Sequence, residues 1–223
     1  MRLRLIECLK AYSPDFRVGR GGACELDETY FPESFKGNHS KGSFALPRKA
    51  RHRGKQVRRR GLSREQICVM TGVSDTNATF FEVSGRGAVS RKRAAEALRD
   101  RIGAGAVVAT DKAAAYIDVL RDLKVASHES YDPKDRSEGT INRINAIHSL
   151  LHSFMARFKG VSTKRLGAYL DWFRWCRTFM AAGSRAAEST VARQLANGTC
   201  PTRVRGMFGL EPPLMDYWDG RAA

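Results

Sequence analysis

Apolar residues in the first half of the chain fall in short runs that are bounded by polar or glycine-rich segments. Residues 67–73 and 78–83 are rich in β-forming side chains, and the polar stretch 74–77 lies between them as a turn. This pattern predicts a β-hairpin. Residues 24–31 also carry β-forming side chains around acidic positions, which predicts a further strand upstream of the hairpin.

The central part of the chain alternates between helical and strand patterns. Ser90 can cap a helix over residues 91–102, and a glycine-containing turn follows that stretch. Residues 106–110 form a continuous apolar run, as a buried parallel strand would, and helical spacing resumes from Tyr116. Residues 125–128 predict one more short strand.

Two longer amphipathic patterns come next. Apolar residues recur at spacings of three and four over 141–158 and again over 163–179, and Gly160 separates the two stretches. The chain therefore has strands first and then alternating strands and helices. This order predicts an α/β fold, with a mixed sheet flanked by helices, and the RNase H-like arrangement is one such fold.

The two ends of the chain lack sustained patterns. We interpret residues 1–22 as an N-terminal linker, residues 23–182 as one domain of catalytic size, and residues 183–223 as a weakly ordered tail. Residues 34–64 are expected to form an insertion in that domain, because their Gly, Pro and charged side chains can bury little surface.

Positive charge dominates the composition and gathers in this insertion. The formal net charge is +16, and residues 34–64 hold 11 Lys or Arg and no acidic residue. A charge run can be merely a solvated surface, but this density favours contacts with the phosphates of a nucleic acid. The candidate DNA-binding side chains are Lys49, Arg51, Arg53, Lys55, Arg58, Arg59, Arg60 and, farther along the chain, Lys112.

Several protein classes are excluded by features that the sequence lacks. No stretch approaches 18 consecutive apolar residues, and the N-terminus carries no apolar segment of signal-peptide length. The five cysteines are widely spaced without a C-x-x-C pair, which argues against a zinc ribbon and fits reduced thiols. We therefore expect a cytoplasmic protein that binds nucleic acid.

Two aspartates occupy unusual positions. Asp27 lies inside the first predicted strand, and Asp111 directly follows the buried run 106–110. Acids are rare in core strands unless they are paired or bind a metal, and sites in α/β sheets gather at the carboxyl ends of strands. The alternatives are a helix N-cap for Asp111 and a solvated edge-strand acid for Asp27. If the two converge, Mg²⁺ or Mn²⁺ would relieve their repulsion.

Three polar residues share one face of the predicted helix over 141–158. Asn145 lies one turn before His148, and His152 lies one turn after it. His148 can be a packed core histidine or part of a site. Zinc is disfavoured, because the sequence holds no H-E-x-x-H motif and no convincing third ligand.

These residues, taken in order, resemble a known family. The sequence is similar to the bacterial insertion-sequence transposases of the DDE superfamily, and in particular to the subgroup with His or Asn at the third catalytic position. The resemblance covers roughly residues 23–180. The motifs that carry it are Asp27-Glu28-Thr29-Tyr30-Phe31, Thr110-Asp111-Lys112 with Tyr116, Asn142-Arg143-Ile144-Asn145-Ala146-Ile147-His148-Ser149, Phe158-Lys159-Gly160-Val161-Ser162-Thr163-Lys164 and Tyr169-Leu170-Asp171-Trp172-Phe173.

The resemblance implies an RNase H-like catalytic core that cleaves and joins DNA strands with two divalent metal ions, Mg²⁺ or Mn²⁺. Asp27 and Asp111 match the two metal-binding acids, His148 matches the third catalytic position, and Asn145 is its companion. The expected partner is DNA, at transposon ends and target sites near the bacterial nucleoid. A homodimer is expected because two ends must be handled.

Two departures from the family leave alternatives open. His152 stands where relatives carry a lysine, and the chain lacks the zinc-ribbon region that usually precedes the catalytic core. The chain can therefore be a truncated remnant that only binds DNA. Glu138 competes with His148 for the third position, since a carboxylate is the better ligand for Mg²⁺. A nuclease on the same fold, which cuts without joining, is a further alternative.

Overall fold

The structure is a computed structural model, and its described residues divide into two compact units. The described residues are 2–38, 46–50, 62–132, 141–180, 183–200, 202, 203, 206 and 210–219. The first unit, unit 1, combines residues 1–13, 32–55 and 154–223. The second, unit 2, combines residues 14–31 and 56–153, and it contains both aspartates singled out by the sequence.

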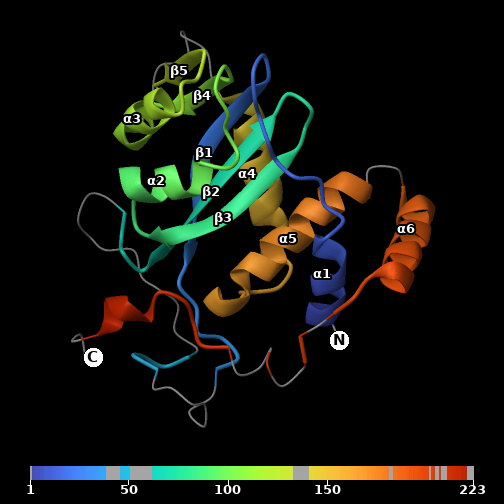
Figure 1. The fold of residues 1–223 in the computed structure, drawn as a ribbon. Coiled ribbons are helices and arrows are strands. Elements are labelled where there is room, and N and C mark those ends of the chain that lie inside the picture. The colour runs from blue at the N-terminus through green and yellow to red at the C-terminus, as the bar shows by residue number, and fades with distance from the viewer. Residues whose placement is uncertain are drawn as a thin grey trace. The chain divides into compact units, whose positions relative to one another are not determined.

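Unit 2 is built on a sheet whose described strands follow the order β3-β2-β1-β4-β5 (Figure 1). The strands are β1 (Ala23–Pro32), β2 (Gln66–Ser74), β3 (Thr79–Arg86), β4 (Val107–Asp111) and β5 (Ser127–Tyr131). β4 runs parallel to β1 and β5 runs parallel to β4, whereas β2 and β3 form an antiparallel hairpin.

Two hydrogen bonds fix the direction of β2 relative to β1. The backbone N–H of Asp75 donates to the carbonyl of Ala23 (2.9 Å), and the hydroxyl of Thr71 donates to the carbonyl of Asp27 (2.8 Å). Since the numbering falls along β2 as it rises along β1, the two strands are antiparallel. A central first strand with a hairpin on one side and two parallel strands on the other is the RNase H-like arrangement. The predicted fold class is therefore confirmed.

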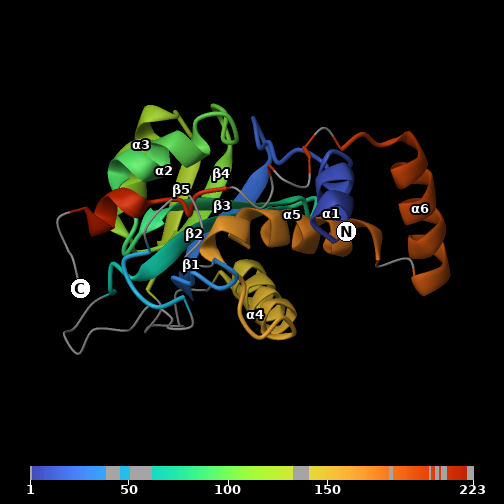
Figure 2. The ribbon, with the colours of Figure 1, turned by 90° about the horizontal axis from the view of Figure 1, so that it is seen from below.

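Helices cover both faces of this sheet. Figure 2 shows α2 (Arg91–Leu98) and α3 (Ala114–Asp122) on one side and α4 (Asn142–Ala156) on the other. On the first side, Leu26 and Val108 of the sheet join one buried cluster with Leu98 of α2 and Leu120 of α3. The second side carries α4, which belongs to unit 2 up to Ser153. The sheet is therefore the middle layer of three.

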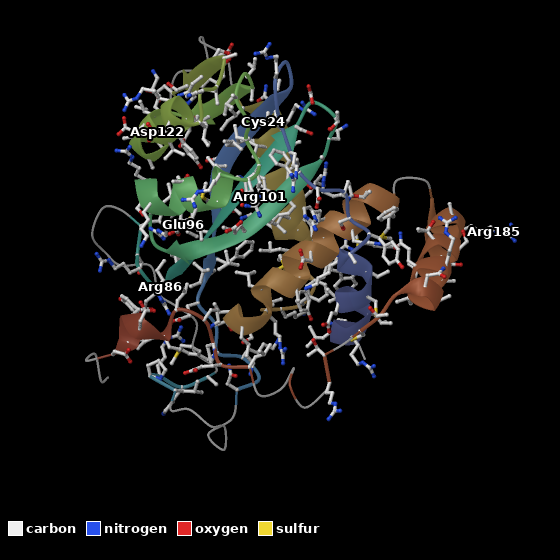
Figure 3. The ribbon with its side chains drawn as sticks, viewed as in Figure 1. Cys24, Arg86, Glu96, Arg101, Asp122 and Arg185 are labelled. Atoms are coloured by element: carbon white, nitrogen blue, oxygen red, sulfur yellow. The ribbon has the colours of Figure 1, made fainter. Side chains whose placement is uncertain are left out.

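Helix α2 ends at Leu98, earlier than the predicted range of 91–102. The chain turns there because Val18, ahead of β1, donates its backbone N–H to the carbonyl of Arg101 (2.8 Å). Figure 3 shows Arg101 beside β3, where its guanidinium lies 2.5 Å from the Glu82 carboxylate. The last predicted turn keeps backbone bonds to Leu98 from Arg101 and Ile102 (each 2.9 Å), and the same stretch pairs with Val18.

Strand β5 is also displaced from the prediction. The apolar residues Val125 and Ala126 suggested a strand over 125–128, but the strand runs from Ser127 to Tyr131. It pairs with β4 at the edge of the sheet, and its side chains are mostly exposed or half-buried. A polar edge strand of this kind carries no apolar run for a sequence pattern to detect.

Unit 1 is mostly helical in its described part. Its elements are α1 (Arg2–Lys10), α5 (Thr163–Phe179), α6 (Ser184–Asn197), the short 3₁₀ helix η2 (Met215–Trp218) and the end of α4. The indole N–H of Trp175 in α5 donates to the amide oxygen of Gln194 in α6 (2.7 Å). Near η2, the buried carboxylate of Glu33 pairs with Arg48 (3.2 Å) and accepts from the indole of Trp218.

Both chain ends therefore differ from the expected linker and irregular tail. Ile6 and Leu9, three residues apart, are the buried residues of α1. Apolar residues at that spacing are typical of a helix that is buried on one side. Helix α6 forms because its alanine-rich sequence favours helix and its Gln194 is buried against α5. The domain boundaries at residues 22 and 182 stay predictions.

Two expectations about chemistry and membranes can be compared with the structure. All five cysteines are free thiols, and Cys24 and Cys68 are buried, as the wide spacing indicated. In the described part of the chain, every helix is too short or too polar to cross a lipid bilayer.

Candidate active site

Asp27 and Asp111 occupy equivalent positions on neighbouring parallel strands. Leu26 of β1 pairs in register with Thr110 of β4, and the two aspartates are the next residues along each strand. Side chains at the same register on adjacent strands project from the same face of a sheet. The structure therefore brings together the two acids that are 84 positions apart in the sequence (111 − 27 = 84).

Burial perturbs both carboxyl groups, and the charge of Asp111 also acts on Asp27. Burial raises the pKa of Asp27 to about 7, the charge of Asp111 raises it further, and a hydrogen bond from the Glu28 backbone (2.8 Å) opposes the rise. Burial also raises the pKa of Asp111, whose Oδ1 accepts from the Ala113 backbone N–H (3.2 Å). Asp111 is therefore not the N-cap of α3, which is Ala113; its carboxylate contacts only the backbone just before the helix among the described hydrogen bonds.

A third acid, Glu28, adds to the negative charge near this pair. Burial and the charge of Asp111 raise the pKa of Glu28 to about 6, and a hydrogen bond from the hydroxyl of Tyr116 opposes that rise. Tyr116 is a residue of α3, and its side chain is fully buried in the hydrophobic cluster that also contains Leu26 and Val108. Glu28 had no separate role in the sequence-based prediction, although it lies next to Asp27 in the predicted strand.

Helix α4 lies along β1 so that successive turns of the helix meet alternate residues of the strand. The carboxylate of Glu25 accepts from the backbone N–H of Ile144 in the first turn (2.9 Å). Two residues farther along the strand, Asp27 Oδ2 lies 3.5 Å from His148 Nδ1. The hydroxyl of Thr29 then lies 2.7 Å from Nε2 of His152.

The match follows from the dimensions of the two elements. Two residues of a strand advance about 6.6 Å and four residues of a helix advance about 6 Å, so contacts can repeat along both. The ring of Phe31 continues the series by stacking on His152, with the ring centroids 4.9 Å apart. This series of contacts holds His148 over Asp27.

His148 is neutral at physiological pH. Burial lowers its pKa to about 4, and the nearby His152 lowers it as well. Its Nε2 lies 2.6 Å from the hydroxyl of Thr71 on β2. The ring therefore sits between Thr71 and Asp27, and it is not a core histidine without polar partners.

The remaining predicted site residues are dispersed or lie outside the described residues. Asn145 is one turn before His148 on α4 and is exposed. Lys112 is exposed next to Asp111, with Nζ 3.9 Å from Asp132, and Lys49 is exposed in unit 1. The positions that the structure does not describe are Arg51, Arg53, Lys55, Arg58, Arg59, Arg60 and Glu138.

The donor set suits a hard divalent cation, although the described residues contain no cluster of three or more His, Cys, Asp or Glu side chains arranged to hold a metal ion. Asp27 and Asp111 supply carboxylate oxygens, which Mg²⁺ and Mn²⁺ prefer. The raised pKa of each carboxyl shows a site that disfavours negative charge without a nearby cation. By the chemistry of their oxygens, Asp27 and Asp111 therefore suit such an ion, and His148 is the polar side chain next to Asp27.

Glu25, Thr29 and Thr71 are the site residues that sequence reasoning missed. Glu25 and Thr29 flank Asp27 at a spacing of two, so they share its face of β1. The sequence alone could therefore have placed Glu25 and Thr29 on the same side of the predicted strand as Asp27. No local pattern connected Thr71 to His148, because that contact depends on which helix covers the sheet.

Comparison with known proteins assigns the chain to a family. The sequence matches the ISXO2-like transposase domain over residues 21–178, which is more than two thirds of the chain. The chain therefore belongs to this family of insertion-sequence transposases, which is part of the DDE superfamily. No curated protein matches the chain.

Two solved structures show a distant likeness. One is described as a pre-cleavage Mos1 transpososome, with 12% identity, a TM-score of 0.29, and coverage of 87% of this chain and 64% of the other. The second is the Mos1 Strand Transfer Complex, with 16% identity, a TM-score of 0.29, and coverage of 89% and 62%. The chain thus spans less than two thirds of either protein, and the assignment rests on the family match.

Proposed function

We propose that unit 2 is the catalytic core of a DNA transposase that cuts DNA at the ends of an insertion sequence and joins the freed strand to target DNA. The observation that carries this proposal is the placement of Asp27 and Asp111 one register step beyond the Leu26–Thr110 pair. Membership in a transposase family supports it.

Asp27 and Asp111 are the residues that would hold Mg²⁺ or Mn²⁺, with His148 at the third position. When bound, these ions would activate the attacking oxygen and stabilise the charge on the phosphoryl and leaving oxygens. The chain itself contributes rigid placement, because Glu25, Thr29 and Thr71 hold α4 and its histidines against the sheet. Asn145, one turn away on the exposed side of α4, would meet the DNA.

The net charge of +16 supports DNA as the partner, because basic side chains that replace counterions gain affinity for a polyanion. Lys112 is exposed beside Asp111, so it is suited to a phosphate near the scissile bond. The basic insertion would supply further phosphate contacts. A homodimer remains part of this proposal because two transposon ends must be cut together.

The proposal is tested by cleavage of a donor DNA that carries the element's own ends. Asp27→Asn and Asp111→Asn should each abolish cleavage with Mg²⁺ or Mn²⁺ and leave DNA affinity close to that of the wild type. Asp122→Asn is the matched control, since Asp122 is exposed on α3 (Figure 3) and pairs with the exposed Arg91 at 2.9 Å. Normal cleavage by either site variant would contradict the proposal.

A second comparison separates a transposase from a nuclease and from an inactive DNA-binding remnant. With pre-cut ends, a transposase should yield joined product, whereas a nuclease should not. A remnant would neither cut nor join.

The third catalytic position is tested in the same assay by His148→Ala and Glu138→Gln. Alanine is used at residue 148 because relatives carry His or Asn at that position. We expect a large loss with His148→Ala and little change with Glu138→Gln. The reverse result would assign the third position to Glu138.

A further inference from the structure

The hydroxyl of Thr71 has two hydrogen-bond partners, and only one can receive its proton. It donates to the backbone carbonyl of Asp27 at 2.8 Å, and it lies 2.6 Å from Nε2 of His148. A carbonyl oxygen can only accept. Since the single hydroxyl hydrogen goes to Asp27, the Thr71 oxygen must accept a hydrogen from the imidazole.

This requirement fixes the tautomer of His148. A neutral imidazole carries one N–H and one lone pair, so a proton on Nε2 leaves the lone pair on Nδ1. Nδ1 is the ring atom that lies 3.5 Å from Oδ2 of Asp27. The lone pair of His148 therefore faces the same space as the Asp27 carboxylate.

The same arrangement occurs on the neighbouring aspartate. The hydroxyl of Thr110 donates to the backbone carbonyl of Asp111 at 2.6 Å and lies 2.8 Å from Nε2 of His128 on β5. Each candidate catalytic aspartate thus has its backbone carbonyl bound by a threonine that also contacts a histidine.

We infer that Thr71 is a positioning residue: its hydroxyl holds His148 in the Nε2–H tautomer, so that Nδ1 is the ring atom available to a ligand between His148 and Asp27. The inference deepens the proposed function, since the ligand would be the divalent cation of that site. The tautomer itself is a property of the metal-free protein, and it can be measured without any activity.

The test is a nitrogen-15 NMR correlation spectrum of histidine-labelled, metal-free protein at pH 8, with the His148 signals assigned by their loss in His148→Asn. Wild-type protein and Thr71→Ser, which keeps the hydroxyl, should show the proton on Nε2. Thr71→Val, which keeps the shape and removes the hydroxyl, should show a mixture or the Nδ1–H form.

Thr178→Val is the matched control. Thr178 is an exposed residue of α5 in unit 1, and its hydroxyl donates to the carbonyl of Arg174 (3.1 Å), so this change should leave the His148 signals in place. An Nδ1–H proton in wild-type His148 would overturn the inference, even if Thr71→Val fails to fold. An unchanged tautomer in folded Thr71→Val would also overturn it.

A Mn²⁺ titration separates this inference from the proposed function. Removing a residue that orients a metal ligand typically weakens metal affinity by about 10–100-fold, and we expect this range for Thr71→Val, with recovery in Thr71→Ser. Equal Mn²⁺ affinity in Thr71→Val and wild type would overturn the positioning role. If the wild type binds no Mn²⁺ and cuts no DNA, the proposed function is wrong, while the tautomer spectra still decide the role of Thr71.

Discussion

Asp27 and Asp111 lie side by side on parallel strands, each one residue beyond the paired Leu26 and Thr110. This relationship joins two acids that no local pattern connects. Burial raises the pKa of both carboxyl groups, and the proximity of Asp111 raises that of Asp27 further. A fold that keeps such a pair gives up stability at the site where the chemistry is proposed.

The stability of the metal-free protein should therefore improve when Asp27 can no longer ionise. Burial raises the pKa of Asp27 from 3.8 to about 7, so the folded state holds this proton more tightly than the unfolded state does. The resulting stability is present below about pH 4 and is lost as the pH rises through about 7. Asp27→Asn should be more stable than wild type at pH 8 by about 2–4 kcal/mol, measured by urea unfolding.

The difference between Asp27→Asn and wild type should grow from pH 4 to pH 8. His148 contributes with the opposite sign, because its lowered pKa makes stability fall as the pH drops below about 6.5. Because His148 contacts Asp27, its contribution can differ between the two proteins, but above about pH 6.5 it is constant, so the change between pH 6.5 and pH 8 isolates Asp27. A difference that does not change with pH would show that the Asp27 carboxyl is not perturbed.

Glu25 should matter for both the stability and the activity of the site. Its carboxylate accepts from the Ile144 N–H in the first turn of α4, one turn before His148. Removing a side chain that satisfies a helix N-terminus costs about 1 kcal/mol, and we expect this loss for Glu25→Ala in urea unfolding. DNA cleavage should fall as well. Glu96→Ala, on the exposed side of α2 (Figure 3), should change neither property.

Tyr116 and Tyr131 offer a matched comparison of buried and exposed hydrogen bonds to acids. The buried Tyr116 hydroxyl donates to Glu28, and the solvent-facing Tyr131 hydroxyl donates to Glu129 at 2.5 Å. Tyr116→Phe removes a donor from a buried carboxylate and should cost about 1–3 kcal/mol at pH 8. The cost should shrink at pH 5, where Glu28, with a pKa of about 6, is protonated. Tyr131→Phe should leave stability unchanged, and equal effects of the two changes would contradict the assignment.

The salt dependence of DNA binding should report which cations touch phosphates. Each lost phosphate contact should flatten the slope of log affinity against log salt concentration by about one unit. We expect this effect for Lys112→Gln and a larger one when Arg58, Arg59 and Arg60 are neutralised together. Lys92→Gln, on the exposed face of α2, is the control. An unchanged slope in the triple variant would mean that the basic insertion does not contact DNA.

Local patterns predicted most of the elements of unit 2. The hairpin over 67–73 and 78–83 corresponds to β2 and β3, since alternation and turn residues act over short stretches. The buried run at 106–110 became β4, displaced by one residue so that it includes Asp111. Because Asp111 directly follows an apolar run, the sequence alone indicated it as a candidate site residue.

Tertiary relationships could not be obtained in the same way. The contact of Thr71 with His148 and that of Glu25 with Ile144 depend on α4 lying over β1 and β2. A strand with a spacing of two and a helix with a spacing of four can match in several registers, and only packing selects one. For the same reason, the N-terminal helix α1 was missed: its short apolar spacing had no visible partner.

The central claim is that Asp27 and Asp111 together capture a divalent cation. Its most direct test is a Mn²⁺ titration of the purified protein at neutral pH, followed by electron paramagnetic resonance, which separates free from bound ion. Wild-type protein should bind Mn²⁺, and both Asp111→Asn and Asp27→Asn should lose that binding while Asp122→Asn keeps it. Equal Mn²⁺ affinity in wild type and Asp111→Asn would contradict the claim.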